Sequence, residues 1–253
     1  MALIGEAAVV NTITMFTESA ELYDLIYSTF KDYAAETEAL AALIRREHPS
    51  AKTILDVACG TAEHARLLAR DHGFIVDGLD LDPSFVKIAR GKLRGDVYGG
   101  DMTSFTLPRR YDVVQCLFSS IGYVRTLDNV RRALERFREH LAPSGIVLVE
   151  PWFAPGTMQH GRVSINTAES GDVRVARMAH TEVEGRLSRI RFEYLIGRPS
   201  GIAHAVELHE LGLFSTEEQL RAFEEAGLMA THDPVGLDGR GLFIARAAFS
   251  RYS

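Results

Sequence analysis

The chain has 253 residues, 46% of them apolar, and a formal net charge of −6 at pH 7, with acidic and basic residues interspersed along its length. This length and apolar content suffice for one elaborated α/β domain with a large core. The charge argues against the basic face that nucleic-acid binding needs, and no apolar run reaches the ~20 residues of a transmembrane helix, so we expect small-molecule partners, no nucleic acid and no membrane.

The N-terminal stretch MALIGEAAVVNTITM carries Glu6 and no basic residue, so it does not have the pattern of a secretory signal. The two cysteines, Cys59 and Cys116, lie in apolar runs and are too few for a disulfide framework. Both observations predict a cytoplasmic protein.

The first predicted elements are helical. Residues 18–48 are amphipathic and predict one or two helices, which belong to an expected N-terminal helical cap over residues 15–50. Residues 51–152 alternate short β-branched runs with amphipathic stretches, the pattern of a parallel sheet whose strands are joined by helices. The expected strands are 53–58, 74–79, 96–98, 111–118 and 145–152, and the expected helices are 62–70, 83–92 and 128–140.

The second part of the chain follows a different pattern. Residues 153–213 contain alternating runs separated by Glu-Gly and Pro-Ser-Gly turns, which predict an antiparallel meander inserted into the core. Residues 214–250 predict a helix over 215–226, capped at Ser215 or Thr216, and a strand that completes the core sheet. The expected fold is a doubly wound, mostly parallel, Rossmann-like α/β sheet with an added antiparallel meander.

The stretch ILDVACGTAEHARLLA, residues 54–69, leads from the first core strand through a glycine turn into a helix. In an open parallel sheet, ligands bind beyond the carboxyl ends of the strands, where the strand order reverses. Asp80 ends the second strand 20 residues after Gly60, the separation at which a carboxylate meets a ribose diol. The GxGxxG spacing of a dinucleotide site is missing and Glu63 stands where phosphates would lie, so we expect a nucleoside cofactor without phosphate.

These motifs resemble those of class I S-adenosylmethionine-dependent methyltransferases. LDVACGTAEHA, the acid that closes the strand in DGLDLDPSFVKIAR, the GDM at Gly100–Met102 and LAPSGIVLVEPW occur in the family's order within residues 20–152. The resemblance implies S-adenosylmethionine as the cofactor and S-adenosylhomocysteine as its product. One departure is Ala62, where the family usually has a third glycine in the turn.

The resemblance, together with the chemistry of the cofactor, assigns the binding residues. Asp80 is expected to bind the ribose hydroxyls and Asp101 the adenine amino group. Asp56 either contacts the cofactor or only orients the turn. The remaining expected contacts are Met102 and Leu117 on the adenine faces, Ala58 and Gly60 along the amino-acid tail, and Lys31 or Tyr33 at the tail's carboxylate.

ELYD, KDYAAE, FSSIGY and GRGLFIA narrow the resemblance to the N,N-dimethyltransferases that act on nucleotide-linked amino sugars in antibiotic biosynthesis, across most of the chain. The family uses its meander to shape the substrate pocket. By match, Tyr23 lies near the reacting sulfonium and amine, and Arg177 and Arg240 meet the pyrophosphate of the substrate. The full set expected at the substrate is Tyr23, Tyr123, Trp152, Phe153, Arg177 and Arg240.

Tyr123 departs from the family, which usually ends the motif SSIG with histidine. A neutral histidine can hold the amine proton, whereas tyrosine, with a pKa near ~10, is a poor base at neutral pH. We therefore expect Tyr123 to orient the acceptor without removing its proton.

Other chemistries are less well supported. The end of the fourth strand, LFSSIGYV, lacks the Asn/Asp-Pro-Pro-Tyr/Phe run typical of methylation at amide or exocyclic base nitrogens. The nine histidines fall at no metal-ligand spacing, so no metal is expected, and His180, His204 and His209 are expected to be surface or sheet residues.

The expected activity is methyl transfer from S-adenosylmethionine to the amine of a small molecule, with a nucleotide-linked amino sugar as one candidate. Three alternatives stay open: an O- or N-methyltransferase of another small metabolite, a non-catalytic S-adenosylmethionine-binding protein, and a nicotinamide dehydrogenase. The sequence leaves undecided the number of methyl groups added and whether the protein forms a homodimer.

Overall fold

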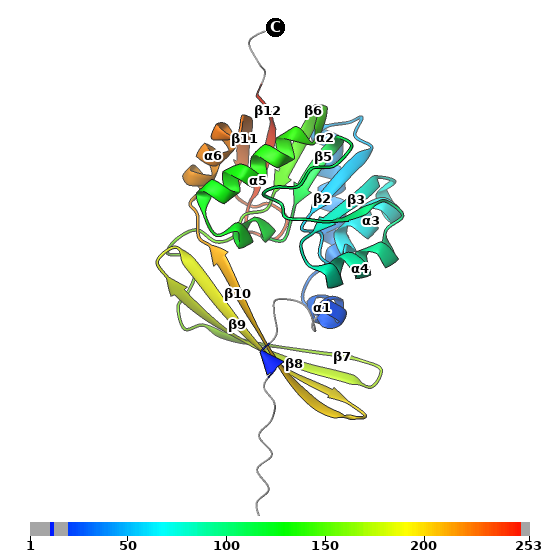
Figure 1. The fold of residues 1–253 in the computed structure, drawn as a ribbon, viewed down its shortest axis with the longest axis vertical. Helices are drawn as coiled ribbons and strands as arrows, with labels where there is room; N and C mark the ends of the chain where they lie inside the picture. The colour runs from blue at the N-terminus through cyan, green and yellow to red at the C-terminus, as the bar shows by residue number, and fades with distance from the viewer. Residues whose placement is uncertain (1–10, 13–19, 249–253) are drawn as a thin grey trace, which may run out of the picture.

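The structure, a computed structural model, describes residues 11–12 and 20–248 (Figure 1). The N-terminal stretch that lacks the pattern of a secretory signal and the start of the expected cap therefore lie largely outside the described residues. The helices are α1 (Ala20–Tyr27), α2 (Tyr33–Glu47), α3 (Glu63–His72), α4 (Pro83–Lys92), the 3-10 helix η1 (Ser120–Val124), α5 (Leu127–Glu139) and α6 (Thr216–Glu225). The strands are β1 (Asn11–Thr12), β2 (Thr53–Val57), β3 (Ile75–Asp80), β4 (Val97–Gly99), β5 (Tyr111–Cys116), β6 (Leu141–Val149), β7 (Val163–Ser170), β8 (Val173–Glu184), β9 (Leu187–Arg198), β10 (Gly201–Gly212), β11 (Leu228–Asp233) and β12 (Leu242–Ala247).

The larger sheet has seven strands in the order β11-β12-β6-β5-β2-β3-β4. β2 pairs in parallel with β3 on one side and β5 on the other, whereas β12 is antiparallel to β6. The strand order therefore reverses between β2 and β5, which is where open α/β sheets bind ligands. The doubly wound, mostly parallel fold is confirmed. Among the described residues, no helix is long and apolar enough to span a lipid bilayer.

Helices cover both faces of this sheet (Figure 1). On one face, Phe137 of α5 and Phe223 of α6 are fully buried against strand residues such as Phe243. On the other, Leu40 of α2 and Leu68 of α3 pack with α4 in a second core. The helices on the two faces shield the sheet from water. The carboxyl edge of the strands is the side of the sheet that these helices leave uncovered.

Local sequence signals set several helix boundaries as expected. Ser215 caps α6, and its hydroxyl accepts from the backbone N–H of Glu218, whose side chain accepts in turn from the N–H of Ser215. Asp82 caps α4, where Pro83 occupies the first turn. Each cap satisfies backbone donors that a helix start leaves unpaired.

Several strands differ from the sequence prediction. β6 begins at Leu141 rather than at residue 145, because Leu141 pairs with Tyr111 across an irregularity in the ladder. The sequence does not predict β7 or β11. β7 carries many polar residues and is largely exposed, so it lacks the apolar alternation that marks a half-buried strand.

The second sheet has the order β1-β10-β9-β8-β7 and lies beyond the carboxyl edge of the first (Figure 1). Its inner face packs against α1, where Leu22 and Ile26 contact a cluster that includes Val175 and Tyr194. α1 therefore lies between the two sheets. The outer face of this second sheet exposes large apolar side chains: Val163, Ile165, Met178, Leu195 and Leu208.

Candidate active site

A cavity of about 1510 Å³ lies between the carboxyl edge of the parallel sheet and the inner face of the antiparallel sheet. Typical ligand pockets measure ~300–1,000 Å³, so this one has room for two bound molecules. The structure brings eleven of the predicted residues to its walls: Tyr23, Ala58, Gly60, Asp80, Asp101, Met102, Tyr123, Trp152, Phe153, Arg177 and Arg240. Four predicted residues do not line it: Lys31, Tyr33, Asp56 and Leu117.

The glycine turn after β2 presents bare backbone to the cavity. Gly60 has a φ of +55°, and a Cβ built there would meet no atom within 4 Å, so the space beside it is open. Ala58 and Ala62 also have positive φ, at 56° and 62°. For a residue with a Cβ this conformation costs roughly 1–2 kcal/mol, and such strain is concentrated at ligand sites. The turn therefore fits a ligand that approaches the backbone closely.

Asp80 fixes the same turn from the end of β3. Its Oδ2 accepts from the backbone N–H of Gly60 at 2.7 Å, and its Oδ1 accepts from the N–H of Asp82 at 2.9 Å. Burial raises the pKa of Asp80, while these two hydrogen bonds act in the opposite direction. A carboxylate offers about four acceptor positions, so Asp80 can hold the turn and still accept from the two hydroxyls of a ribose.

The neighbouring wall has the groups that an adenine ring needs. Asp101 accepts from the backbone N–H of Thr103 at 2.7 Å and lies beside Met102 on the cavity. Leu117, expected on a ring face, is 4% exposed and belongs to the core under the sheet. Phe118, which the sequence reasoning missed, lines the cavity in its place.

Asp56 is buried in β2 and does not line the cavity. Its carboxylate accepts from Gln115 Nε2 at 3.0 Å, and burial raises its pKa to about 6. A role of Asp56 in orienting the turn stays a prediction.

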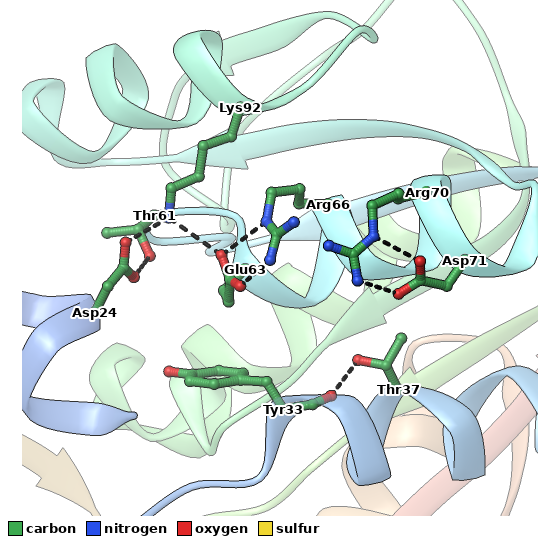
Figure 2. Close-up of polar contacts among 9 residues, drawn as sticks. All are labelled: Asp24, Tyr33, Thr37, Thr61, Glu63, Arg66, Arg70, Asp71 and Lys92. Atoms are coloured by element: carbon green, nitrogen blue, oxygen red, sulfur yellow. Dashed lines mark hydrogen bonds and ion pairs between the residues drawn. The ribbon is translucent and has the colours of Figure 1, made fainter. Parts of the chain in front are cut away.

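An ionic network ties α1 to the glycine turn (Figure 2). Asp24 accepts from Thr61 Oγ1 and pairs with Lys92, and Lys92 also pairs with Glu63 at 3.3 Å. Since Thr61 follows Gly60 directly, these contacts fix the position of the helix that carries Tyr23 relative to the turn.

Lys31 and Tyr33 lie near this network. Lys31 pairs with Glu36 at 2.6 Å, above the ring of Phe118, and Glu36 also contacts His64 Nε2 at 2.8 Å. Burial opposes the ionisation of Glu36, but the hydrogen bonds from His64 and Lys31 lower its pKa overall. Tyr33 lines a separate hollow of about 680 Å³. Contact of either residue with the cofactor tail stays a prediction.

Two phenols, Tyr23 and Tyr123, stand on the cavity wall near the inner face of the antiparallel sheet. Burial raises the pKa of both well above the ordinary value, so both are neutral at physiological pH. The phenol of Tyr123 contacts His209 Nδ1 at 2.8 Å. His209, expected to be an ordinary surface or sheet residue, is 3% exposed and lines the cavity from β10.

Arg177 and Arg240 bring positive charge to the cavity. Arg177 is buried, stacks on the rings of Tyr27 and Phe192 at 4.9 and 4.6 Å, and donates to Asn166 at 3.0 Å. No group among the described residues accepts from its buried Nε. Arg240 donates to Ser119 Oγ at 3.0 Å. The arrangement therefore offers a carboxylate and bare backbone at the sheet edge, and phenols and cations facing them.

Comparison with known proteins agrees with this geometry. The sequence profile of a family of methyltransferase domains matches residues 54–145. The dTDP-3-amino-3,6-dideoxy-alpha-D-glucopyranose N,N-dimethyltransferase of Streptomyces fradiae is 45% identical over 229 residues, which cover 89% of each chain.

Two solved structures extend the similarity to the whole fold. The crystal structure of Streptomyces venezuelae DesVI gives a TM-score of 0.85 at 38% identity, covering 90% of this chain and 98% of that chain. CalS10 with bound S-adenosylmethionine, an amino pentose methyltransferase of Micromonospora echinaspora involved in calicheamicin biosynthesis, gives a TM-score of 0.79 at 33% identity, covering 88% and 95%. Both sheets of this chain therefore have counterparts in structures of this kind.

Proposed function

This chain belongs to the S-adenosylmethionine-dependent N,N-dimethyltransferases of dTDP-linked amino sugars, and we propose that its own substrate is a dTDP-linked 3-amino-deoxyhexose whose amine it methylates twice. The observation that carries the proposal is the cavity of about 1510 Å³, which has a nucleoside-binding turn on the parallel sheet and two arginines on its walls. A neutral amine acceptor needs no such cations, whereas a diphosphate does. The nucleotide part of the substrate would account for them.

The cofactor site is assigned to residues of the parallel sheet. When bound, S-adenosylmethionine supplies an electrophilic methyl group on a positively charged sulfur. We assign the ribose hydroxyls to Asp80, the adenine amino group to Asp101, and the ring faces to Met102 and Phe118. Gly60 leaves the turn open for close approach, since no atom lies within 4 Å of its Cβ position.

The substrate site is assigned to the facing wall. Arg177 and Arg240 would hold the pyrophosphate, with Trp152 and Phe153 beside Arg240 as apolar wall. Tyr23 and Tyr123 would hold the amine with its lone pair directed at the methyl group. Fixing reactants in a reactive alignment contributes about 7–11 kcal/mol, so positioning supplies most of the rate.

The test is a turnover assay of the purified protein with S-adenosylmethionine and dTDP-3-amino-3,6-dideoxyglucose, followed by mass spectrometry. We expect products that carry one and then two added methyl groups. Methylation of another small amine or of a hydroxyl compound, with none on the amino sugar, would contradict the proposed substrate. Binding of S-adenosylhomocysteine without turnover on a broad acceptor panel would favour a non-catalytic protein.

Tyr23→Phe is expected to lower kcat about tenfold, because the variant loses one hydrogen bond to the amine, worth ~1.4 kcal/mol in the transition state. Calorimetric binding of S-adenosylhomocysteine should stay unchanged. Tyr98→Phe, on β4 and away from the cavity, is the matched control. An unaltered kcat in Tyr23→Phe would remove this tyrosine from the substrate site.

We also infer that the protein works in the cytoplasm and pairs with a second copy. Cys59 and Cys116 are free thiols, which suits a reducing compartment. The outer face of the antiparallel sheet carries the exposed apolar residues named above, a surface that a second copy of the chain related by a two-fold axis would bury.

Light scattering of the wild-type protein should therefore give twice the mass of one chain. Met178→Glu and Leu195→Glu place charge on this outer face and are expected to reduce the mass to that of one chain. Met229→Glu, equally exposed but on β11, is the control. A single-chain mass for the wild-type protein would rule out the pairing.

A further inference from the structure

A chain of buried polar groups leads from the cavity into the antiparallel sheet. Tyr123 Oη lies 2.8 Å from His209 Nδ1, and His209 Nε2 lies 3.4 Å from Glu207 Oε2. The same Glu207 oxygen accepts from the phenol of Tyr194 at 2.8 Å. His209 and Glu207 are 3% and 1% exposed, so the chain is shielded from bulk water along most of its length.

The two contacts of the His209 ring define its protonation. To accept a hydrogen bond from the phenol of Tyr123, Nδ1 must have a lone pair and no hydrogen. To donate a hydrogen bond to the Glu207 carboxylate, Nε2 must carry a hydrogen. The consistent tautomer therefore carries its hydrogen on Nε2 and keeps a lone pair on Nδ1, directed at Tyr123. A carboxylate behind an imidazole also stabilises the imidazolium that forms when the ring accepts a second proton.

We propose that His209, oriented by Glu207, accepts through Tyr123 the proton that the substrate ammonium must lose before methyl transfer. This inference rests on the proposed function and deepens it. Tyr123 lines the cavity, but a neutral phenol is by itself a poor proton acceptor. It can pass a proton on only if a base lies behind it. The imidazole of His209 lies one hydrogen bond behind the phenol of Tyr123, where it can act as that base.

The proton transfer balances without any further reagent. An N–H bond of the ammonium breaks and its proton bonds to Tyr123 Oη, while the proton that Oη carried moves to His209 Nδ1. The nitrogen keeps the electron pair and becomes a neutral nucleophile. Tyr123 ends neutral, as it began, and His209 ends as an imidazolium beside the Glu207 carboxylate.

Other groups also face His209 and influence its protonation. Arg177 of β8 opposes the imidazolium, and Glu207 of β10 favours it. The phenols of Tyr23, Tyr27 and Tyr194, from α1 and β9, line the same small pocket of the cavity wall. Glu207 is in direct contact with the ring, so we expect its influence to exceed that of the others.

The first test measures kcat against pH for the wild-type protein and His209→Asn. Asparagine keeps a hydrogen-bonding group toward Tyr123 but cannot accept a proton. We expect kcat near neutral pH to fall about 100-fold. If His209 accepts the proton, kcat of the wild-type protein should depend on pH in a way that the variant does not reproduce.

Further variants separate the relay from a structural role. Tyr123→Phe alone and Tyr123→Phe with His209→Asn should be equally slow, because either change breaks the same path. Tyr123→His with His209→Asn should regain most of the lost rate, since the imidazole then stands on the cavity itself. His204→Asn is the control: it lies on the same strand, contacts Glu193 at 2.5 Å on the outer face, and should behave as wild type.

All variants should bind S-adenosylhomocysteine as the wild type does, which calorimetry checks independently of turnover. Wild-type kcat and an unchanged pH profile in His209→Asn would overturn the relay and leave the methyltransferase assignment intact. A wild-type protein that methylates no amine would overturn the proposed function and the relay with it.

Discussion

Asp80→Ala should raise the dissociation constant for S-adenosylhomocysteine at least about 100-fold and abolish measurable turnover. Asp80 is 8% exposed and lies at the carboxyl end of β3 beside the glycine turn. Hydrogen bonds to a charged group contribute ~1.5–3 kcal/mol each, and the two ribose hydroxyls together therefore account for about 3 kcal/mol or more. That free energy corresponds to the expected change in affinity.

The carboxylate also supports the turn, because it accepts from the backbone N–H groups of Gly60 and Asp82. Asp80→Asn keeps one acceptor oxygen and should give an intermediate affinity, which separates loss of shape from loss of charge. Asp71→Ala removes an exposed carboxylate that pairs with Arg70 and is the matched control (Figure 2). Near-wild-type affinity in a folded Asp80→Ala protein would place the nucleoside elsewhere.

The sequence predicts the parallel part of the fold well because its strands are buried on both faces. Mostly apolar, largely buried strands such as β2 and β5 can be recognised without knowledge of their partners. β7 and β11 bury at most one face, and their solvent-facing residues are polar, so their sequences do not differ clearly from loops. Their pairing with β8 and β12 comes from the tertiary fold, which no local pattern contains.

The same difference between buried strands and irregular segments explains which site residues could be predicted from the sequence. The ends of β2 and β3 are fixed by the parallel sheet, so Gly60 and Asp80 could be placed on the cavity from their spacing alone. Leu117 was expected on the adenine from the family resemblance, with the strand predicted to continue to residue 118. The chain leaves β5 at Cys116, and Phe118 and Ser119 adopt φ of 52° and 60°, which breaks the alternation.

His209 could not be assigned from sequence for a different reason. Both faces of β10 carry polar and apolar residues, with Glu207 and His209 on one and Leu208 and Glu210 on the other. The alternation of side chains along β10 therefore shows which residues share a face of the sheet, but it does not show which face is turned toward the cavity. The position of α1 against the sheet decides this, and it depends on packing between segments far apart in the chain.

Glu150 should make the protein less stable as the pH rises. Glu150 is 1% exposed, its Oε2 accepts from the backbone N–H of Phe118 at 2.7 Å, and no described group donates a hydrogen bond to its buried Oε1. Burial, reinforced by Asp238, raises the pKa of Glu150 from 4.5 to about 7, although Arg240 and Lys31 act in the opposite direction. The folded protein therefore holds this proton over a pH range in which the unfolded chain has lost it.

The sign follows from this difference in proton binding. Between pH 4.5 and about 7 the folded state binds more protons at Glu150 than the unfolded state does, so the free energy of unfolding falls as the pH rises through that window. The shift corresponds to roughly 3 kcal/mol, reached in full above the folded-state pKa. Glu150→Gln has no proton to lose, and its amide oxygen can still accept from Phe118.

The measurement is urea unfolding of the wild-type protein and Glu150→Gln across this pH range. The free energy of unfolding of the wild type minus that of the variant should fall by roughly 3 kcal/mol between the two ends, because groups common to both proteins cancel. Glu225→Gln, exposed at the end of α6, is the matched control for the change from carboxylate to amide. A flat difference for Glu150→Gln would mean that Arg240 and Lys31 outweigh burial and keep the carboxylate ionised under the cavity wall.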